Sequence, residues 1–287
     1  MEPKKMSTTR MRKMKTDGVP ISVVTAYDYT SAKLAEEAGV DVILVGDSLG
    51  NVVQGQESTL PVTLDEMIYH TKMVTRAISA PFVVSDMPFM TYHGSIDQSL
   101  HNVGRLMREG LCKAVKMEGG TEIAHTVDAV VKAGVPVMGH IGLTPQSVYQ
   151  IGGYKIQGKT GVSARKLMDD AKALEQAGAF AIVVELVTDE IAEEITKAVS
   201  IPTIGIGAGV HCDGQVLVFH DLLQYASPVF PKKFVKAYAN IGDSIRNGIA
   251  QYVQEVKSRS FPAQEHTFHA DLELAGHLYG GKSPDND

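Results

Sequence analysis

The sequence predicts an α/β protein in which eight strands alternate with helices and close into a (β/α)8 TIM barrel. Two observations support this prediction. An amphipathic helix, a glycine and a β-branched apolar run recur along the chain, and the runs are apolar on both faces, as in parallel strands covered by helices. An open, doubly wound sheet is the alternative that the same pattern allows. The expected strands are residues 21–28, 40–47, 81–88, 112–119, 135–142, 180–187, 201–208 and 214–221.

Helices precede several of these strands, and each has an apolar stripe at three- and four-residue spacing. Examples are residues 31–39, 99–110, 123–134 and 167–178. Their final glycines, Gly39, Gly110, Gly134 and Gly178, are expected to be left-handed C-caps. The basic opening MEPKKMSTTRMRKMK lacks a clean apolar face, so a solvated first helix is expected there.

No low-complexity linker divides the chain, which predicts one barrel domain over residues 1–262, including the N-terminal helix. Residues 263–287 lose the periodicity and are expected to form a C-terminal arm with a disordered end after Gly281. The net charge of −6 argues against a nucleic-acid partner, and no apolar run is long enough to cross a membrane. Cys112 and Cys212 are expected to be free thiols in a reducing cytoplasm.

Charged and polar residues stand where the predicted strands end. Because the carboxyl ends of parallel barrel strands meet at one face, these residues are expected to surround one cavity, where active sites of such barrels lie. Three carboxylates in a half-buried pocket repel one another unless a cation compensates them. Oxygen ligands suit Mg²⁺, whereas no Cys/His cluster favours zinc. The strand-end residues are Asp47, Asp86, Lys116, Glu118, His140 and Glu185.

Each of these residues also has a structural explanation. A single aspartate at a strand end is commonly an Asx turn or a helix N-cap, and Asp28 in TAYD is a candidate. Lys116 and Glu118 taken singly could be solvated rim residues. Independent caps, however, would not need to gather on one predicted face.

Glu185 differs from the others because it lies in apolar sequence between FAIVV and LV. Such surroundings favour a carboxyl group that can take up a proton, as a general base must. A buried glutamate satisfied by a neighbouring strand or by water is the alternative. The long, glycine-rich connection at residues 139–161 is expected to serve as a lid or to contact substrate.

Several long strings carry a resemblance to one family. They include TAYDYTSAKLAEEAGVDVILVGDSLG, DMPF, KMEGG, GHIGLTPQS, IGIGAG, CDGQVLVFHDLL, FVKAYA and SFPAQEHTF. With these strings the chain resembles the ketopantoate hydroxymethyltransferases nearly from end to end. The resemblance implies a barrel of the phosphoenolpyruvate mutase/isocitrate lyase type.

The resemblance also implies a reaction. It is the transfer of a hydroxymethyl group from 5,10-methylenetetrahydrofolate to 3-methyl-2-oxobutanoate through a Mg-bound enolate, giving 2-dehydropantoate and tetrahydrofolate for pantothenate biosynthesis. Asp47, Asp86 and Glu118 would hold Mg²⁺, and Asp47 and Asp86 would also contact substrate. Ser48 and Lys116 would bind the oxoacid carboxylate, Glu185 would accept the proton, and His140 is a weaker candidate for substrate contact. A cytoplasmic homodecamer is implied as well.

Two other functions are compatible with the same residues. A Mg²⁺-dependent carbon–carbon lyase acting on a 2-oxo or 2-hydroxy acid could use the same rim. A catalytically inactive barrel serving as a scaffold would not depend on Asp86 and would not bind Mg²⁺.

Overall fold

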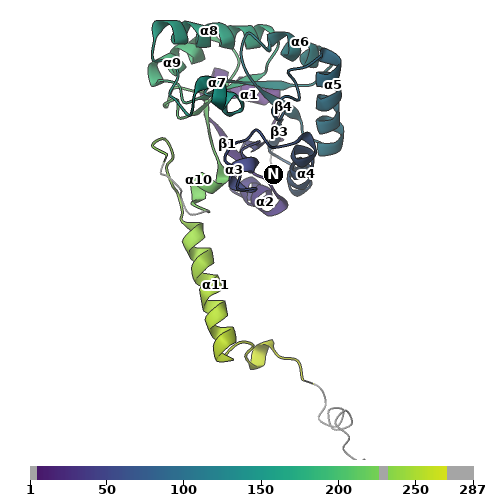
Figure 1. Cartoon of the computed structure of the whole chain (residues 1–287), viewed down its shortest axis with the longest axis vertical. Coiled ribbons are helices and arrows are strands. Elements are labelled where there is room, and N and C mark those ends of the chain that lie inside the picture. The colour runs from purple at the N-terminus through teal and green to yellow at the C-terminus, as the bar shows by residue number, and fades with distance from the viewer. Residues whose placement is uncertain (1–4, 226–231, 270–287) are drawn as a thin grey trace, which may run out of the picture. The chain divides into compact units, whose positions relative to one another are not determined.

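The structure is a computed structural model that describes residues 5–225 and 232–269 (Figure 1). Contacts divide the chain into two compact units, Met1–Ala239 and Asn240–Asp287. The first unit contains the whole barrel, whereas the sequence pattern suggested a domain that extends to residue 262. The segment after Gly281, for which a disordered end was expected, lies outside the described residues.

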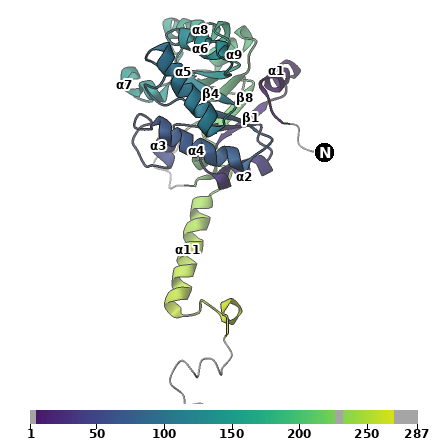
Figure 2. The same cartoon turned by 90° about the vertical axis from the view of Figure 1, so that its right-hand side faces the viewer.

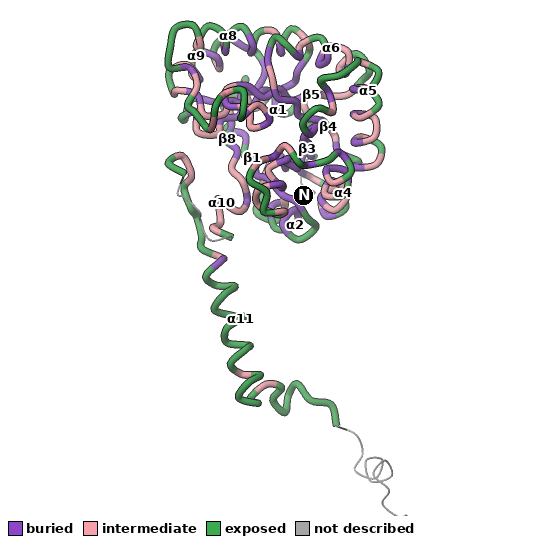
Figure 3. Tube along the Cα trace, in the orientation of Figure 1, coloured by how far each residue is buried: buried purple, intermediate pink, exposed green. Residues whose placement is uncertain are grey.

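Eight parallel strands form a closed barrel in the order β1 to β8, which confirms the predicted fold and excludes the open sheet. The last strand pairs with the first, with Ile21 opposite Gly214. Most strand residues are buried, as expected for strands covered by helices (Figure 3). The strands are β1 Ile21–Thr25, β2 Val42–Val45, β3 Phe82–Asp86, β4 Ala114–Glu118, β5 Val137–Gly142, β6 Ala181–Glu185, β7 Thr203–Ile206 and β8 Gly214–Leu217.

Helices surround the barrel on its outer side (Figures 1 and 2). Their buried residues recur on one side of each helix, which is the apolar stripe expected from the sequence. In this unit the helices are α1 Thr8–Asp17, α2 Tyr29–Glu37, α3 Leu49–Val52, α4 Leu64–Ala77, α5 Ile96–Arg105, the π-helical turn η1 Leu106–Gly110, α6 Ala124–Lys132, the 3-10 turn η2 Pro145–Ser147, α7 Val148–Ile151, α8 Gly161–Gln176, α9 Asp189–Ala198 and α10 Phe219–Leu223.

Three of the four expected helix-ending glycines have positive φ angles, namely Gly39, Gly134 and Gly178. The prediction is wrong at Gly110, because Leu111 adopts the left-handed conformation with φ of 63°. Gly110 instead ends η1, where a Cβ atom would lie 2.9 Å from the Thr71 side chain. Close helix packing, and not backbone conformation, therefore requires glycine at this position.

The amino end of the barrel is closed by apolar side chains from the start of the chain. Met6 and Met11 are buried in the same core cluster as Ile21, Val42 and Phe82, which lie at the beginnings of strands. The expectation of a solvated first helix is therefore wrong for one side of α1. Isolated methionines provide this contact, and they are too few to form a recognisable apolar face in the sequence.

The second unit contains α11 Ile241–Ser258 and the short turn η3 Gln264–His266. Its helix is exposed along most of its length (Figure 3). Within the described residues, no helix is both long enough and apolar enough to span a bilayer. Exposed apolar side chains recur along the helix at Ile245, Ile249, Tyr252, Val253 and Val256.

Candidate active site

The residues singled out at the strand ends meet in one cavity of about 130 Å³ at the carboxyl end of the barrel. The cavity is lined by all six of them, namely Asp47, Asp86, Lys116, Glu118, His140 and Glu185, and by Ser48, which the family resemblance had added.

Asp47 and Asp86 come from neighbouring strands and lie against each other. Asp86 is the last residue of β3, and Asp47 follows β2 by one glycine. The Asp47 backbone N–H donates to Asp86 Oδ2 at 3.0 Å. Both aspartates are buried, with exposed fractions of 3% and 2%. Neither one acts as a helix cap, which was the structural explanation left open by the sequence.

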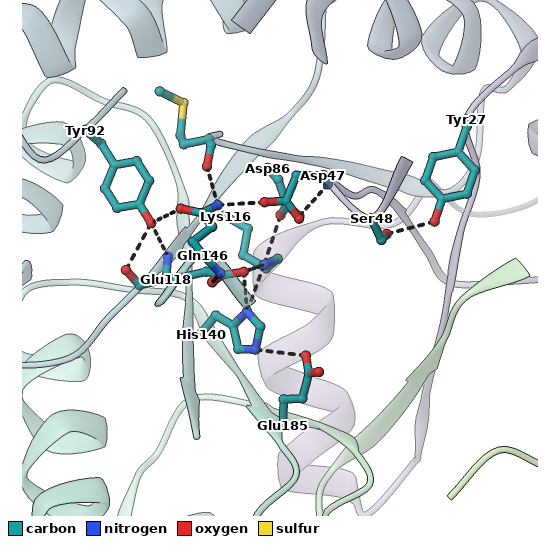
Figure 4. A network of polar contacts seen from close by, with 11 residues as sticks. Tyr27, Asp47, Ser48, Asp86, Tyr92, Lys116, Glu118, His140, Gln146 and Glu185 are labelled. Atoms are coloured by element: carbon teal, nitrogen blue, oxygen red, sulfur yellow. Dashed lines mark hydrogen bonds and ion pairs between the residues drawn. The ribbon is translucent and has the colours of Figure 1, made fainter. Parts of the chain in front are cut away.

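Lys116 and Glu118 are supplied by β4, and the barrel register aligns each with a partner on an adjacent strand. Asp86 is opposite Lys116 and His140 is opposite Glu118. The Lys116 Nζ atom lies 3.1 Å from Asp86 Oδ1 and 3.6 Å from Glu118 Oε1 (Figure 4). Residues two apart on a strand share a face, so both β4 side chains point into the cavity.

Glu185 ends β6 and contacts His140, with 3.2 Å between Oε2 and the imidazole Nε2 (Figure 4). The apolar surroundings expected for Glu185 are thus interrupted by an imidazole. The Glu185 side chain keeps 16% of its surface exposed, whereas the side chains of Asp86 and Glu118 keep only 3% each. Glu185 is therefore the carboxylate of this group that a ligand in the cavity can reach most readily.

The His140 ring lies between the Lys116 ammonium and the carboxylates of Glu118 and Glu185, which have opposite effects on its charge. Burial and Lys116 lower its pKa, but Glu118 and Glu185 outweigh them and raise the pKa to about 9, which favours an imidazolium. Lys116 Nζ, however, lies 2.9 Å from His140 Nδ1, and two cationic donors would repel at that distance. This short contact assigns a neutral ring, in which Nδ1 accepts from Lys116 and Nε2 carries the proton.

Negative charge exceeds positive charge in the cavity. Burial and the neighbouring carboxylates raise the pKa of Asp47 well above its ordinary value, and burial also raises the pKa of Asp86. Burial opposes the ionisation of Glu118, but the Lys116 ammonium and the Gln146 backbone N–H lower its pKa. Burial lowers the pKa of Lys116. The carboxylates of Asp86, Glu118 and Asp47 raise the pKa by more than burial lowers it, so the ammonium stays charged. A divalent cation would relieve this imbalance.

The donor atoms are suitable for Mg²⁺. Asp86 Oδ1 is buried and, among the described residues, accepts no hydrogen bond of good geometry despite its proximity to Lys116. Within the same described part of the chain, no group of three or more His, Cys, Asp or Glu residues is arranged to hold a metal. The adjacent pair Asp47 and Asp86 still suits Mg²⁺, which commonly takes one or two carboxylates and fills its remaining positions with water and substrate.

Three residues of this network were not found by the sequence analysis. Gln146 donates from Nε2 to Asp47 Oδ2 at 2.8 Å, and Tyr92 bonds to Gln146 Oε1 at 2.8 Å. Tyr27 pairs with the Ser48 hydroxyl at 2.8 Å (Figure 4). Gln146 lies in the glycine-rich connection that the sequence marked as functional, which was the one signal available for it. Nothing in the sequence around either tyrosine indicated a contact with the site.

The closed barrel has the fold of several solved structures. The fold is similar to that of 2,3-dimethylmalate lyase, a member of the phosphoenolpyruvate mutase/isocitrate lyase superfamily, with a TM-score of 0.57 at 18% identity. The match covers 97% of this chain and 96% of that structure. The expected type of barrel is thus confirmed.

Within that fold, residues 5–264 match the family model described as ketopantoate hydroxymethyltransferase, and the chain belongs to this family of enzymes. It is 54% identical to the 3-methyl-2-oxobutanoate hydroxymethyltransferase of Carboxydothermus hydrogenoformans over 96% of this chain and 99% of the relative. It is 56% identical to the protein of the same name from Geobacillus sp. (strain WCH70), over 94% of this chain and 96% of the relative.

Proposed function

We propose that this chain transfers a hydroxymethyl group from 5,10-methylenetetrahydrofolate to 3-methyl-2-oxobutanoate, giving 2-dehydropantoate and tetrahydrofolate in pantothenate biosynthesis. The observation that carries the proposal is the convergence of Asp47, Asp86, Lys116 and Glu185 in one cavity. This cavity belongs to a chain 54% identical to a relative named for the same oxoacid.

Lys116 and Ser48 would bind the oxoacid carboxylate. The Lys116 ammonium is buried and keeps its charge among acidic neighbours, so it can offset a second anion that enters the cavity. The Ser48 hydroxyl is oriented by Tyr27 and can donate to the same carboxylate. These two contacts would direct the branched carbon of the oxoacid toward Glu185, across the cavity.

Glu185 would remove the proton from the carbon beside the ketone. His140 Nε2 carries a proton, lies 3.2 Å from Glu185 Oε2 and would orient this carboxylate, while Glu185 itself keeps the proton taken from the substrate. The carbon of the resulting enolate attacks the one-carbon unit of the folate. A bond forms between the enolate carbon and the one-carbon unit. The bonds that join the one-carbon unit to the folate nitrogens break, and water supplies the oxygen of the new hydroxymethyl group.

Asp47 and Asp86 would hold Mg²⁺, with Glu118 close by. Bound there, the ion would supply Lewis-acid stabilisation to the ketone oxygen of the oxoacid, where negative charge develops as the proton leaves.

The direct test is an incubation of the purified chain with 3-methyl-2-oxobutanoate, 5,10-methylenetetrahydrofolate and MgCl₂. We expect 2-dehydropantoate by mass spectrometry, and its loss when EDTA is added. Absence of this product under all conditions would contradict the proposal. Cleavage of a 2-oxo or 2-hydroxy acid instead would favour a lyase.

Replacement of Asp47 by Asn tests the metal site separately. The variant keeps the shape of the side chain and removes one of the two carboxylates, so we expect Mg²⁺ to bind about 100-fold more weakly, which corresponds to about 2.7 kcal/mol. Isothermal titration with MgCl₂ measures this change. Asp97→Asn, in the first turn of α5 and outside the cavity, is the matched control and should bind as the wild type does. An unchanged isotherm for Asp47→Asn would exclude Asp47 as a ligand.

We further propose that the chain acts in the cytoplasm as a homo-oligomer, a decamer by its resemblance to the family. The exposed apolar residues of α11, such as Ile249 and Tyr252, support association, because an apolar helix face is stabilised when another surface covers it. Sedimentation equilibrium of the full chain measures the mass, and a monomer at micromolar concentration would contradict this proposal.

A further inference from the structure

Gln146 contacts two of the cavity carboxylates at once. It is the central residue of η2, after β5, and it is 4% exposed. Its Nε2 atom donates to Asp47 Oδ2 at 2.8 Å and to the Met87 carbonyl at 2.9 Å. Its backbone N–H donates to Glu118 Oε2 at 3.0 Å. One residue therefore links the carboxylates that follow β2 and end β4 (Figure 4).

The amide of Gln146 can adopt only one orientation. Its Oε1 atom lies 2.8 Å from the hydroxyl of Tyr92, a buried side chain whose oxygen also accepts the Glu118 N–H at 3.0 Å. If the amide were reversed, Oε1 would face two acceptors, Asp47 Oδ2 and the Met87 carbonyl, and the NH₂ group would lose both. The acceptors at Asp47 and Met87 therefore orient the Gln146 amide, and Gln146 in turn fixes the Asp47 carboxylate. The Tyr92 hydroxyl contacts the amide oxygen and also has the Glu118 carbonyl within reach at 3.0 Å.

We propose that Gln146 is a positioning residue that orients Asp47 for the divalent cation. Its amide occupies Oδ2 and leaves Oδ1, to which no described residue donates, for the ion. Because Gln146 lies on the connection after β5, the conformation of that connection and the geometry of the carboxylates depend on each other. The inference rests on the proposed function, since it concerns the cation of that reaction.

Gln146→Met tests the inference because methionine keeps most of the length and volume and removes both polar atoms of the amide. With MgCl₂ alone titrated into the full chain, we expect the dissociation constant to rise about 10- to 100-fold, as for other groups that orient metal ligands. In turnover assays the KM for the oxoacid at limiting Mg²⁺ should rise, while kcat at saturating Mg²⁺ falls much less. A purely structural role would lower thermal stability without this separation of KM and kcat.

Gln54→Met is the matched control. Gln54 also donates from Nε2 to a carboxylate, Glu66 Oε1 at 2.8 Å, but it does not line the cavity. Its loss should leave the affinity for Mg²⁺ at the wild-type value.

Tyr92→Phe provides a second variant that keeps the buried ring and removes only the hydroxyl. We expect a smaller rise in the dissociation constant, about threefold to tenfold, as for one lost hydrogen bond. If the wild type binds Mg²⁺ and Gln146→Met binds it equally well, the inference is overturned while the proposed function stands. Should Gln146→Met fail to fold, an unchanged constant for Tyr92→Phe overturns it. A wild type that binds no Mg²⁺ would overturn both the inference and the proposed metal site.

Discussion

Lys15 and Lys116 lie at opposite ends of the barrel, and they differ in whether donors balance the carboxylates around them. Lys15, at the amino end, donates to two backbone carbonyls and to Asp213 Oδ2, all within 3.0 Å. Asp213 in turn accepts from the Thr203 N–H and hydroxyl. Lys15 and Asp213 thus satisfy each other, and among the described residues this pair leaves no charge for a ligand to balance.

At the carboxyl end, Lys116 faces more carboxylates than it can neutralise. Asp86 and Glu118 are within 3.6 Å of its Nζ atom, Asp47 is close by, and Asp86 Oδ1 is left without a hydrogen bond among the described residues. A buried ion pair such as Lys15 and Asp213, whose donors and acceptors balance, is structural. A surplus of acceptors indicates that a cation or a substrate completes the site.

Glu185→Gln should have the largest effect of these variants, and it should act only on the proton-transfer step at the carboxyl end of the barrel. The amide cannot take up the substrate proton, so exchange of the C3 proton of 3-methyl-2-oxobutanoate into D₂O should slow by about 10²- to 10⁴-fold. Proton NMR follows the exchange. Glu190→Gln, on an exposed position of α9, should exchange at the wild-type rate. Unimpaired exchange in Glu185→Gln would assign the base to another residue.

Lys15→Met should have the opposite effect: the protein should lose stability and keep its rate of proton exchange. Methionine retains much of the aliphatic chain, but Asp213 loses a charged donor, so we expect the free energy of unfolding to fall by about 2 kcal/mol. Urea denaturation measures the fall, and the exchange assay should be unchanged. Lys13→Met removes an ion pair with Asp17 that is largely exposed and should leave stability as it is. A loss of activity in Lys15→Met would mean that the two ends are coupled.

Glu36, at the amino end, should contribute a small, pH-dependent amount to the free energy of unfolding. Burial opposes its ionisation, but N–H donors of Ser79 and Ala80, with help from Lys33, lower its pKa from 4.5 to about 2. Because the pKa is lower in the folded state, its contribution is full above about pH 4.5 and is lost as the pH falls toward 2.

Glu36→Gln should therefore cost about 1 kcal/mol at neutral pH and progressively less in acid. Urea denaturation at pH 7 and at pH 3 measures the difference. Glu37→Gln, the exposed neighbour, is the control and should leave both values unchanged. An equal loss for Glu36→Gln at both pH values would assign the contribution to packing and not to charge.

Much of the fold could be predicted because it follows from local patterns. Helix stripes, apolar strands and the glycines Gly39, Gly134 and Gly178 each depend on residues within a few positions of one another. The contribution of Met11 to the core could not be predicted in this way. One methionine is buried by strands that follow it much later in the sequence, and its own helix gives no periodic signal.

The candidate site shows the same limit. Asp47, Asp86, Lys116, Glu118, His140 and Glu185 could be proposed together, because strand ends of a parallel barrel share one face. Gln146 and Tyr92 could not be proposed, since their role depends on which atoms they reach across the cavity. No spacing in the sequence encodes that contact.

Asp28 and Asp47 show which contacts follow from local sequence and which depend on the folded chain. Asp28 and Asp47 both follow an apolar strand, and the sequence alone established that each carboxylate lies at the rim of the barrel. Asp28 caps α2 by accepting the Ser31 N–H at 2.7 Å, a contact made within one helical turn. Asp47 instead meets Asp86 and Gln146 from distant segments. Only closure of the barrel brings those groups together, because electrostatic and hydrogen-bonding partners are selected by distance in space.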